Sequence, residues 1–174
     1  MPDTKLLTII RLSDKKPKEL LIYLAGLIKQ DKTLLADFAV SLDNAKDAQK
    51  GTCVEALEYA TQTNPEIAIP HLKSIINSLT DQAPRVKWEA ARVIANLAPK
   101  YPTQAAQALD NLLLNTKDKG TVVRWSTALA LGEILKANAK IRASLQKTIE
   151  DLVKKEANNG VKNVYLKALK VVGK

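Results

Sequence analysis

One segment of about 37 residues recurs along this sequence, and the recurrence limits the possible folds more than any other feature. Residues 84–98, PRVKWEAARVIANLA, align with residues 121–135, TVVRWSTALALGEIL, at an offset of 37, which places Trp88 on Trp125. A weaker copy aligns Cys53 with Trp88 at an offset of 35. A partial copy aligns Val161 with Val123 at an offset of 38. A unit of this length cannot bury its apolar face alone, so we expect successive copies to stack against one another.

Each unit carries two amphipathic helical patterns. The first pattern places apolar or small residues at Trp88, Ala91 and Ala95, with steps of three and four residues. The second pattern follows a proline, Pro65 or Pro102, of the kind found at the first position of a helix. Only six glycines, seven prolines and 4% aromatic residues are present, which disfavours a sandwich or a barrel. The sequence therefore predicts an all-α protein with well over half of its residues in about ten helices and with no sheet.

We expect a single domain, because the loops between the helical patterns are too short to be linkers. The first 48 residues match the repeat only as a helical hairpin, which is typical of the end of a repeat array. The last helical pattern has no second helix after it and is expected to cap the other end. The predicted organisation of residues 1–174 is a degenerate N-terminal cap at 1–48, repeats at 49–82, 84–119 and 121–158, and a C-terminal capping helix at 159–174.

Residues 81–97, DQAPRVKWEAARVIANL, resemble the first helix of a HEAT repeat, in which an acidic residue precedes a proline, a valine with a basic residue, and then alanine and leucine. The next unit is similar, with Thr121 in the place of the proline. The resemblance covers residues 49–174 and implies a right-handed α-solenoid of about four to five HEAT-like helical hairpins. It also implies a structural ladder of acidic and basic residues between repeats. That ladder would consist of Asp81, Lys87, Asp118, Arg124, Glu156 and Lys162.

Residues suited to catalysis are sparse. Cys53 and His71 are the only cysteine and histidine, too few for a disulfide or a zinc site. Cys53 shares the register of Trp88 and is expected in the core, whereas His71 is expected at the surface or half-buried, with no partner for a catalytic triad. The glycines form no phosphate-binding motif. We expect no enzyme activity, no cofactor and no metal, and, since no apolar leader is present, a cytoplasmic location without membrane contact.

The two tryptophans allow two interpretations. The HEAT-like proteins include DNA glycosylases, which are basic and use an acidic residue and aromatic residues in a concave cleft, so Trp88 and Trp125 could line a cleft. However, the two residues recur once per repeat at the same register, as a core position shared by adjacent repeats would. No residue of the glycosylase catalytic pattern can be matched. We therefore expect both indoles to be largely buried, so that Trp88→Ala costs about 3 to 5 kcal/mol.

The positive charge lies in the last third of the chain. Residues 1–116 carry 14 lysines and arginines against 13 acidic residues, whereas residues 117–174 carry 13 against 5. Asn163, Lys167, Lys170 and Lys174 would share one face of the last helix. We favour a solubilising cap for this face over the alternative, a surface for phosphate or for an acidic protein.

The second helices provide the candidate binding surface, because HEAT-like scaffolds bind along a concave second-helix face. Aligned rows of these helices mix charges and amides rather than repeating a basic residue, which suits a protein or peptide better than a phosphate backbone. We expect a non-catalytic scaffold for a protein or peptide partner. The alternative is a nucleic-acid-binding relative of the glycosylase branch that uses the basic C-terminal third. The candidate contact residues are Lys73, Asn77, Asn111, Lys147 and Glu150.

Overall fold

The computed structural model describes residues 4–173, and within this range the chain is all-helical. Eleven α-helices and two 3-10 helices account for 78% of these residues, and none of residues 4–173 lies in a strand. The prediction of an all-α protein is therefore confirmed. No helix in the same range is both long and apolar enough to cross a lipid bilayer.

Residues 4–44 form three α-helices and one 3-10 helix. Thr4 caps the first of them, because its side-chain oxygen accepts a hydrogen bond from the N–H of Leu7, and its hydroxyl lies 2.6 Å from that of Ser41. This buried contact joins the start of the first helix to the helix that contains Ser41. The elements are α1 (Lys5–Leu12), α2 (Pro17–Gln30), the 3-10 helix η1 (Lys32–Leu35) and α3 (Phe38–Asn44).

The first helix of each repeated unit is long and continuous. Pro84 is the first residue of one of these helices, a position that suits proline. Asn158 caps the helix that begins at Asn159, because its side chain accepts a hydrogen bond from the N–H of Val161. These four helices are called the first helices below. They are α4 (Asp47–Thr61), α6 (Pro84–Leu97), α9 (Thr121–Ala137) and α11 (Asn159–Val172).

The second segment of a unit is one unbroken helix only in the last complete unit. Pro65 and Pro102 lie in the first turn of their segments, as predicted. Pro70 has no N–H to donate to a continuing α-helix, which explains why the first of these segments starts as a 3-10 helix. The segments are η2 (Pro65–His71) with α5 (Leu72–Ser78), α7 (Pro102–Ala106) with α8 (Leu109–Asn115), and α10 (Arg142–Lys155).

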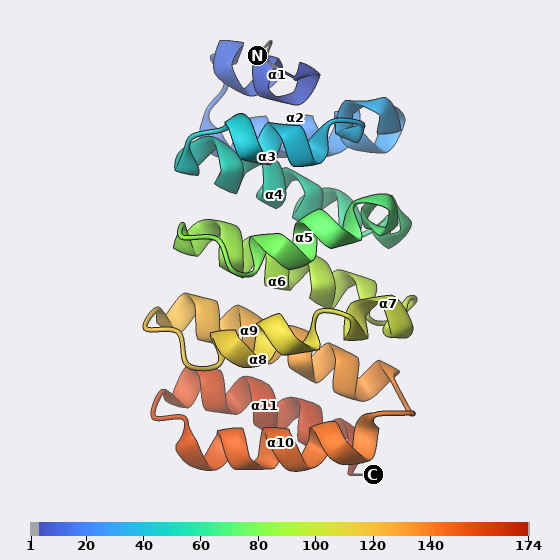
Figure 1. Cartoon of the computed structure of the whole chain (residues 1–174), viewed down its shortest axis with the longest axis vertical. Coiled ribbons are helices and arrows are strands. Elements are labelled where there is room, and N and C mark those ends of the chain that lie inside the picture. The colour runs from blue at the N-terminus through green and yellow to red at the C-terminus, as the bar shows by residue number, and fades with distance from the viewer. Residues whose placement is uncertain (1–3, 174) are drawn as a thin grey trace.

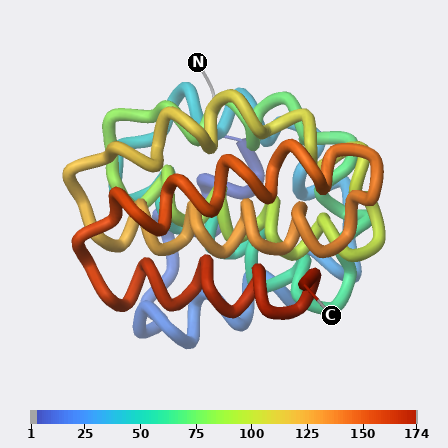
Figure 2. The backbone as a smooth tube through the Cα atoms, turned by 90° about the horizontal axis from the view of Figure 1, so that it is seen from below, coloured from blue at the N-terminus to red at the C-terminus, as the bar shows by residue number. Residues whose placement is uncertain are grey.

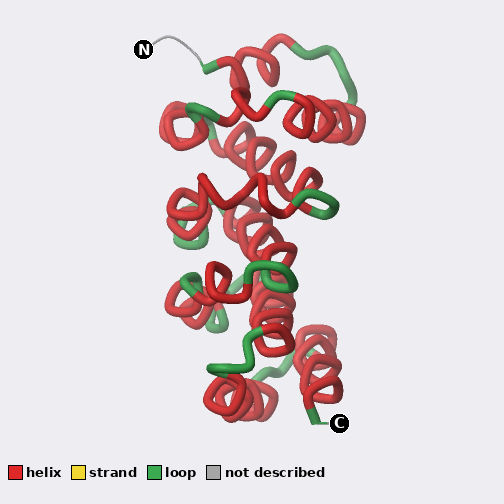
Figure 3. The backbone as a smooth tube through the Cα atoms, turned by 90° about the vertical axis from the view of Figure 1, so that its right-hand side faces the viewer, coloured by secondary structure: helices red, strands yellow, loops and turns green. Residues whose placement is uncertain are grey.

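The helices form two layers (Figure 1). In one layer α2, α4, α6, α9 and α11 pack side by side in chain order, and α3, α5, α8 and α10 lie in the other. Figures 2 and 3 show that the outer members of the first layer, α2 and α11, project beyond the helices between them, on the side away from the second layer. The solvent-facing side of this layer, called the first-helix face below, is therefore concave.

Close packing of the first helices depends on small residues. Gly132 of α9 meets α11 so closely that an added Cβ would lie 2.9 Å from the Cβ of Ala168. Gly51 of α4 is crossed by the side chain of Arg85, whose Cδ would lie 2.8 Å from a Cβ at that position. A side chain at Gly132 would push α9 and α11 apart, so this glycine fixes the distance between them, whereas at Gly51 the flexible Arg85 side chain could move aside.

Candidate interaction surface

Successive first helices are joined by ion pairs at one edge of the stack. Each pair links a basic residue near the start of one first helix to an acidic residue just before the next. Lys87 Nζ lies 2.8 Å from Asp118 Oδ2, and Arg124 Nε lies 2.9 Å from Glu156 Oε2. The third pair joins Lys50 Nζ to Asp81 Oδ2 at 3.2 Å. We call these three pairs the ladder.

Each ladder carboxylate also accepts a backbone hydrogen bond from the residue two positions later. Asp118 accepts from the N–H of Gly120 at 2.7 Å. Burial opposes ionisation of Asp118, but the hydrogen bonds from Lys87 and Gly120 lower its pKa below the usual value. The same causes, with Arg124 as the cation, lower the pKa of Glu156. Asp118 and Glu156 therefore remain ionised, each held by one cation and one amide.

The sequence resemblance named most of these residues but not Lys50. Lys50 lies 37 residues before Lys87, and Lys87 lies 37 residues before Arg124. The offset of 35 that aligned Cys53 with Trp88 hid this spacing. At the other end, Lys162 of α11 is half-buried but forms no ion pair with any residue from 4 to 173.

The candidate residues on the second helices are not brought together in one site. Lys73 and Asn77 are exposed on α5, and Lys147 and Glu150 are exposed on α10. Asn77 lines a cavity of about 190 Å³ between α3 and α5. Glu150 accepts a hydrogen bond from Gln146 of its own helix.

Asn111 makes a structural contact through its amide nitrogen. It is half-buried, and its Nδ2 donates to the carbonyl oxygen of Ile76 at 3.0 Å. Asn115, one turn further on, donates in the same way to Leu79 at 2.7 Å. These two amides link α8 to α5.

Cys53 and His71 occupy the expected environments. Cys53 is completely buried, and burial raises the pKa of its thiol to about 12, so it is not a reactive nucleophile. His71 is half-buried with its ring edge-on to Phe38, at a centroid distance of 5.6 Å, and desolvation lowers its pKa. No cluster of three or more metal-ligating side chains occurs within the described part of the chain.

The prediction that both tryptophans are largely buried is wrong. Trp125 is 40% exposed and Trp88 is half-buried, and both line a cavity of about 400 Å³ on the first-helix face. Helix α9 is apolar on nearly all sides, and Leu131 and Ile134 face the core while Val122 and Trp125 face solvent. The two tryptophans therefore share a position on the outer face of their helices rather than in the core.

A group of buried charges closes the α4 side of this cavity. Glu58 of α4 and Glu89 of α6 are each about 97% buried and both contact Arg92, at 3.2 and 3.1 Å. Trp88 Nε1 donates to Glu89 Oε1 at 2.6 Å, which fixes the indole against α6. Burial raises the pKa of Glu89 to about 7, although the nearby Arg92 acts to lower it. The sequence analysis missed these three charged residues.

Trp125 also borders a second cavity, of about 280 Å³, between α9 and α11. Leu129 lines both cavities with it, and Lys167 and Val171 of α11 line the second. Lys167 is one of the four residues expected to share a face of the last helix. Asn163 and Lys170 are exposed beside it, whereas Lys174 lies outside the described residues. The predicted basic face therefore adjoins the cavity at Trp125.

A scan against models of known protein families finds none that matches this chain, and a search of curated protein sequences finds no match either.

Proposed function

We propose that the chain is a HEAT-like right-handed α-solenoid that acts as a non-catalytic cytoplasmic scaffold and binds an acidic peptide segment of another protein on its first-helix face. The observation that carries this proposal is the position of Trp125, an exposed indole between two cavities. An exposed aromatic side chain between two cavities is of the kind that forms a binding hot spot.

The sizes and polarities of the cavities favour a peptide with apolar side chains. Volumes of about 400 and 280 Å³ on either side of Trp125 each accommodate one or two side chains. Val122 is 52% exposed and Val171 57% exposed, so the floor is apolar on both sides. These side chains lose contact with water only when a partner covers them, which favours binding.

The charges around the second cavity favour an acidic partner. Lys167 lines it and Lys170 follows on the same helix, and neither is in an ion pair with a residue from 4 to 173. Lys136 is already paired with Glu133. An acidic segment lying across α9 and α11 would therefore meet uncompensated positive charge beside apolar pockets, which aids association and sets orientation.

Peptide display on the immobilised protein tests this function. We expect random libraries to yield peptides that combine acidic and large apolar residues. Their affinity should fall at least tenfold with Trp125→Ala, equivalent to about 1.4 kcal/mol. Leu114→Ala is the matched control, because Leu114 is a 66% exposed apolar residue on α8 in the other layer. Peptides that bind Trp125→Ala normally but lose affinity for Leu114→Ala would contradict the proposal.

Nucleic acid is the alternative partner, because residues 117–174 carry a net charge of +8. A titration of duplex DNA against salt distinguishes the two. Binding through phosphate contacts weakens linearly in log affinity with log salt, by about 0.9 for each contact. Tight binding at physiological salt that falls along such a line, and that Trp125→Ala does not alter, would favour nucleic acid over the peptide.

A further inference from the structure

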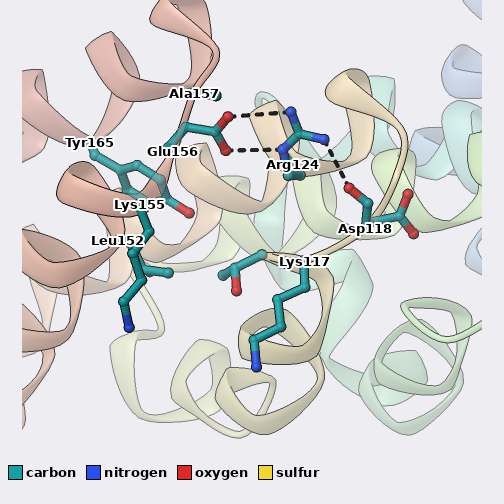
Figure 4. A pocket seen from close by; sticks show the side chains of 9 residues that line it. Lys117, Asp118, Arg124, Leu152, Lys155, Glu156, Ala157 and Tyr165 are labelled. Carbon is teal, nitrogen blue, oxygen red and sulfur yellow. Dashed lines mark hydrogen bonds and ion pairs between the residues drawn. The ribbon is translucent and has the colours of Figure 1, made fainter.

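A third cavity, of about 390 Å³, lies beside the last ion pair of the ladder, Arg124–Glu156 (Figure 4). It is bordered by the loop before α9, by the end of α10 and by the start of α11. Its lining includes Arg124 and Glu156, which form the last ladder pair, and three residues with no role in the ladder. These three are Lys117, Lys155 and Tyr165.

The two acidic groups at this cavity are already neutralised. Asp118 is bound by Lys87 and by the N–H of Gly120. Glu156 receives Arg124 on both of its oxygens and the N–H of Asn158 on one of them. Their lone pairs facing these donors are therefore occupied, and neither carboxylate needs a further cation.

The two lysines remain uncompensated. Lys117 and Lys155 are exposed, and neither pairs with an acidic residue within the described range. Figure 4 shows both ammonium groups on the same side of the Arg124–Glu156 pair. Together with the ladder cations Lys87 and Arg124 they supply four positive charges against the carboxylates of Asp118 and Glu156, so these six side chains carry a net charge of +2.

Tyr165 provides a hydrogen-bond donor that reaches this charged space from a buried ring. The residue is only 2% exposed, and its hydroxyl points toward the middle of the cavity in Figure 4. No residue from 4 to 173 forms a hydrogen bond with this hydroxyl. Burial raises its pKa above the usual value, and the neighbouring Glu156 acts in the same direction, so the hydroxyl stays protonated at neutral pH. The ring is buried, but the hydroxyl oxygen is open to the cavity and keeps its proton free to donate to a ligand or to water.

From these features we infer a binding site for a phosphate monoester, formed by Lys117, Lys155 and Tyr165. A monoester carries close to two negative charges at neutral pH and has three strong acceptor oxygens. The lysines match the charge, and the Tyr165 hydroxyl donates to one oxygen. The cavity is larger than a phosphate group alone, so it has room for the carbon atoms next to the ester. The monoester can belong to a small metabolite or to a phosphorylated side chain, and both present the same group.

Calorimetric titration at pH 8 with four probes tests the site. The probes are inorganic phosphate, glycerol 3-phosphate, a short phosphoserine peptide and dimethyl phosphate, which is a monoanionic diester. We expect the monoesters to bind at least tenfold more tightly than dimethyl phosphate. Tighter binding of glycerol 3-phosphate would identify a small metabolite as the ligand, and tighter binding of the phosphoserine peptide would identify a phosphorylated side chain. If no monoester binds, or if dimethyl phosphate binds equally well, the inference is wrong.

Variants locate the binding. Tyr165→Phe keeps the ring and removes only the donor, and should weaken the best monoester about tenfold. Lys117→Gln with Lys155→Gln should weaken it at least about thirtyfold. The controls are Tyr101→Phe, a half-buried phenol, and Lys73→Gln with Lys147→Gln, which removes the same charge from exposed positions on α5 and in the middle of α10, outside the cavity lining. Equal losses in the control and cavity variants would show diffuse attraction to a basic protein and would overturn the site. The Trp125→Ala variant should bind the monoester normally, which separates this result from the proposed peptide function.

Discussion

The ladder and the first-helix face repeat with the same 37-residue period but differ in what is repeated. At the ladder, the cation, the carboxylate and the backbone amide recur together at three successive rungs. On the first-helix face the tryptophan recurs, but its surroundings do not. Trp88 is held by Glu89, whereas Trp125 is exposed between two cavities.

This difference separates positions that hold the stack together from positions left open to a partner. Positions 37 residues after Glu89 and Arg92 are Ser126 and Leu129, so the polar contacts of α6 have no equivalent on α9. A repeated residue whose partners also repeat is satisfied within the fold. A repeated residue whose partners are lost is free to contact something else, and Trp125 is of that kind.

The largest effect is expected at the ladder. Arg124→Met should lower the free energy of unfolding by about 2 to 3 kcal/mol, because Glu156, whose side chain is only 7% exposed, loses its cation. Lys162→Met, at the corresponding position of α11 where no rung forms, should change it by less than about 0.5 kcal/mol. Urea unfolding measures both. Equal losses would show that the rungs do not stabilise the stack.

The next effect concerns the spacing of the first helices. Gly132→Ala should destabilise the protein by about 1 kcal/mol, because the new methyl group must displace Ala168. Gly26→Ala is the matched control in α2, where nothing lies within 4 Å of the new Cβ. That change should stabilise the helix by up to about 1 kcal/mol. A stabilising Gly132→Ala would contradict the close packing of α9 against α11.

A pH dependence is expected from the buried carboxyl beside Trp88. Burial raises the pKa of Glu89 from 4.5 to about 7, so between these values the folded protein holds a proton that the unfolded chain releases. This group therefore makes the protein less stable as the pH rises from about 5 to 8. Glu89→Gln should remove that decline and leave the variant more stable than the wild type by about 1 kcal/mol at pH 8.

Melting temperatures of both proteins from pH 5 to 8 measure this difference. His71, whose pKa is lowered, also titrates in this range, but it contributes equally to both proteins and cancels. A difference that does not change with pH would show that Glu89 is ionised throughout the range.

The smallest effect on stability is expected at the exposed tryptophan. Trp125→Ala should cost less than about 1 kcal/mol, whereas Trp88→Ala should cost about 1 to 2 kcal/mol through the lost hydrogen bond and packing. Both values are below the 3 to 5 kcal/mol expected for a core residue. Fluorescence of the two single-tryptophan proteins gives a second measurement, with Trp125 emitting at longer wavelength and quenched more strongly by iodide. Equal quenching would remove the contrast between the two positions.

The helices were predictable from the sequence because apolar spacing and proline positions are local signals. The face that each helix buries was harder to predict, because α9 carries apolar residues on nearly all sides. The contacts of Glu58 with Arg92 join α4 to α6, and no local pattern encodes such a pair. Lys50 could have been found, since an exact offset of 37 connects it to Lys87 and Arg124. Tyr165 and the lysines around it come together only through the stacking of α9, α10 and α11.

The central claim is that a partner binds the first-helix face at Trp125 rather than the second helices. Amide chemical-shift mapping with a peptide selected on the wild-type protein tests it most directly. We predict that the largest shifts fall on α6, α9 and α11 around Trp88, Trp125 and Lys167, and that the indole N–H of Trp125 moves more than that of Trp88. Shifts concentrated on α5, α8 and α10, around Lys73, Asn77 and Lys147, would contradict it.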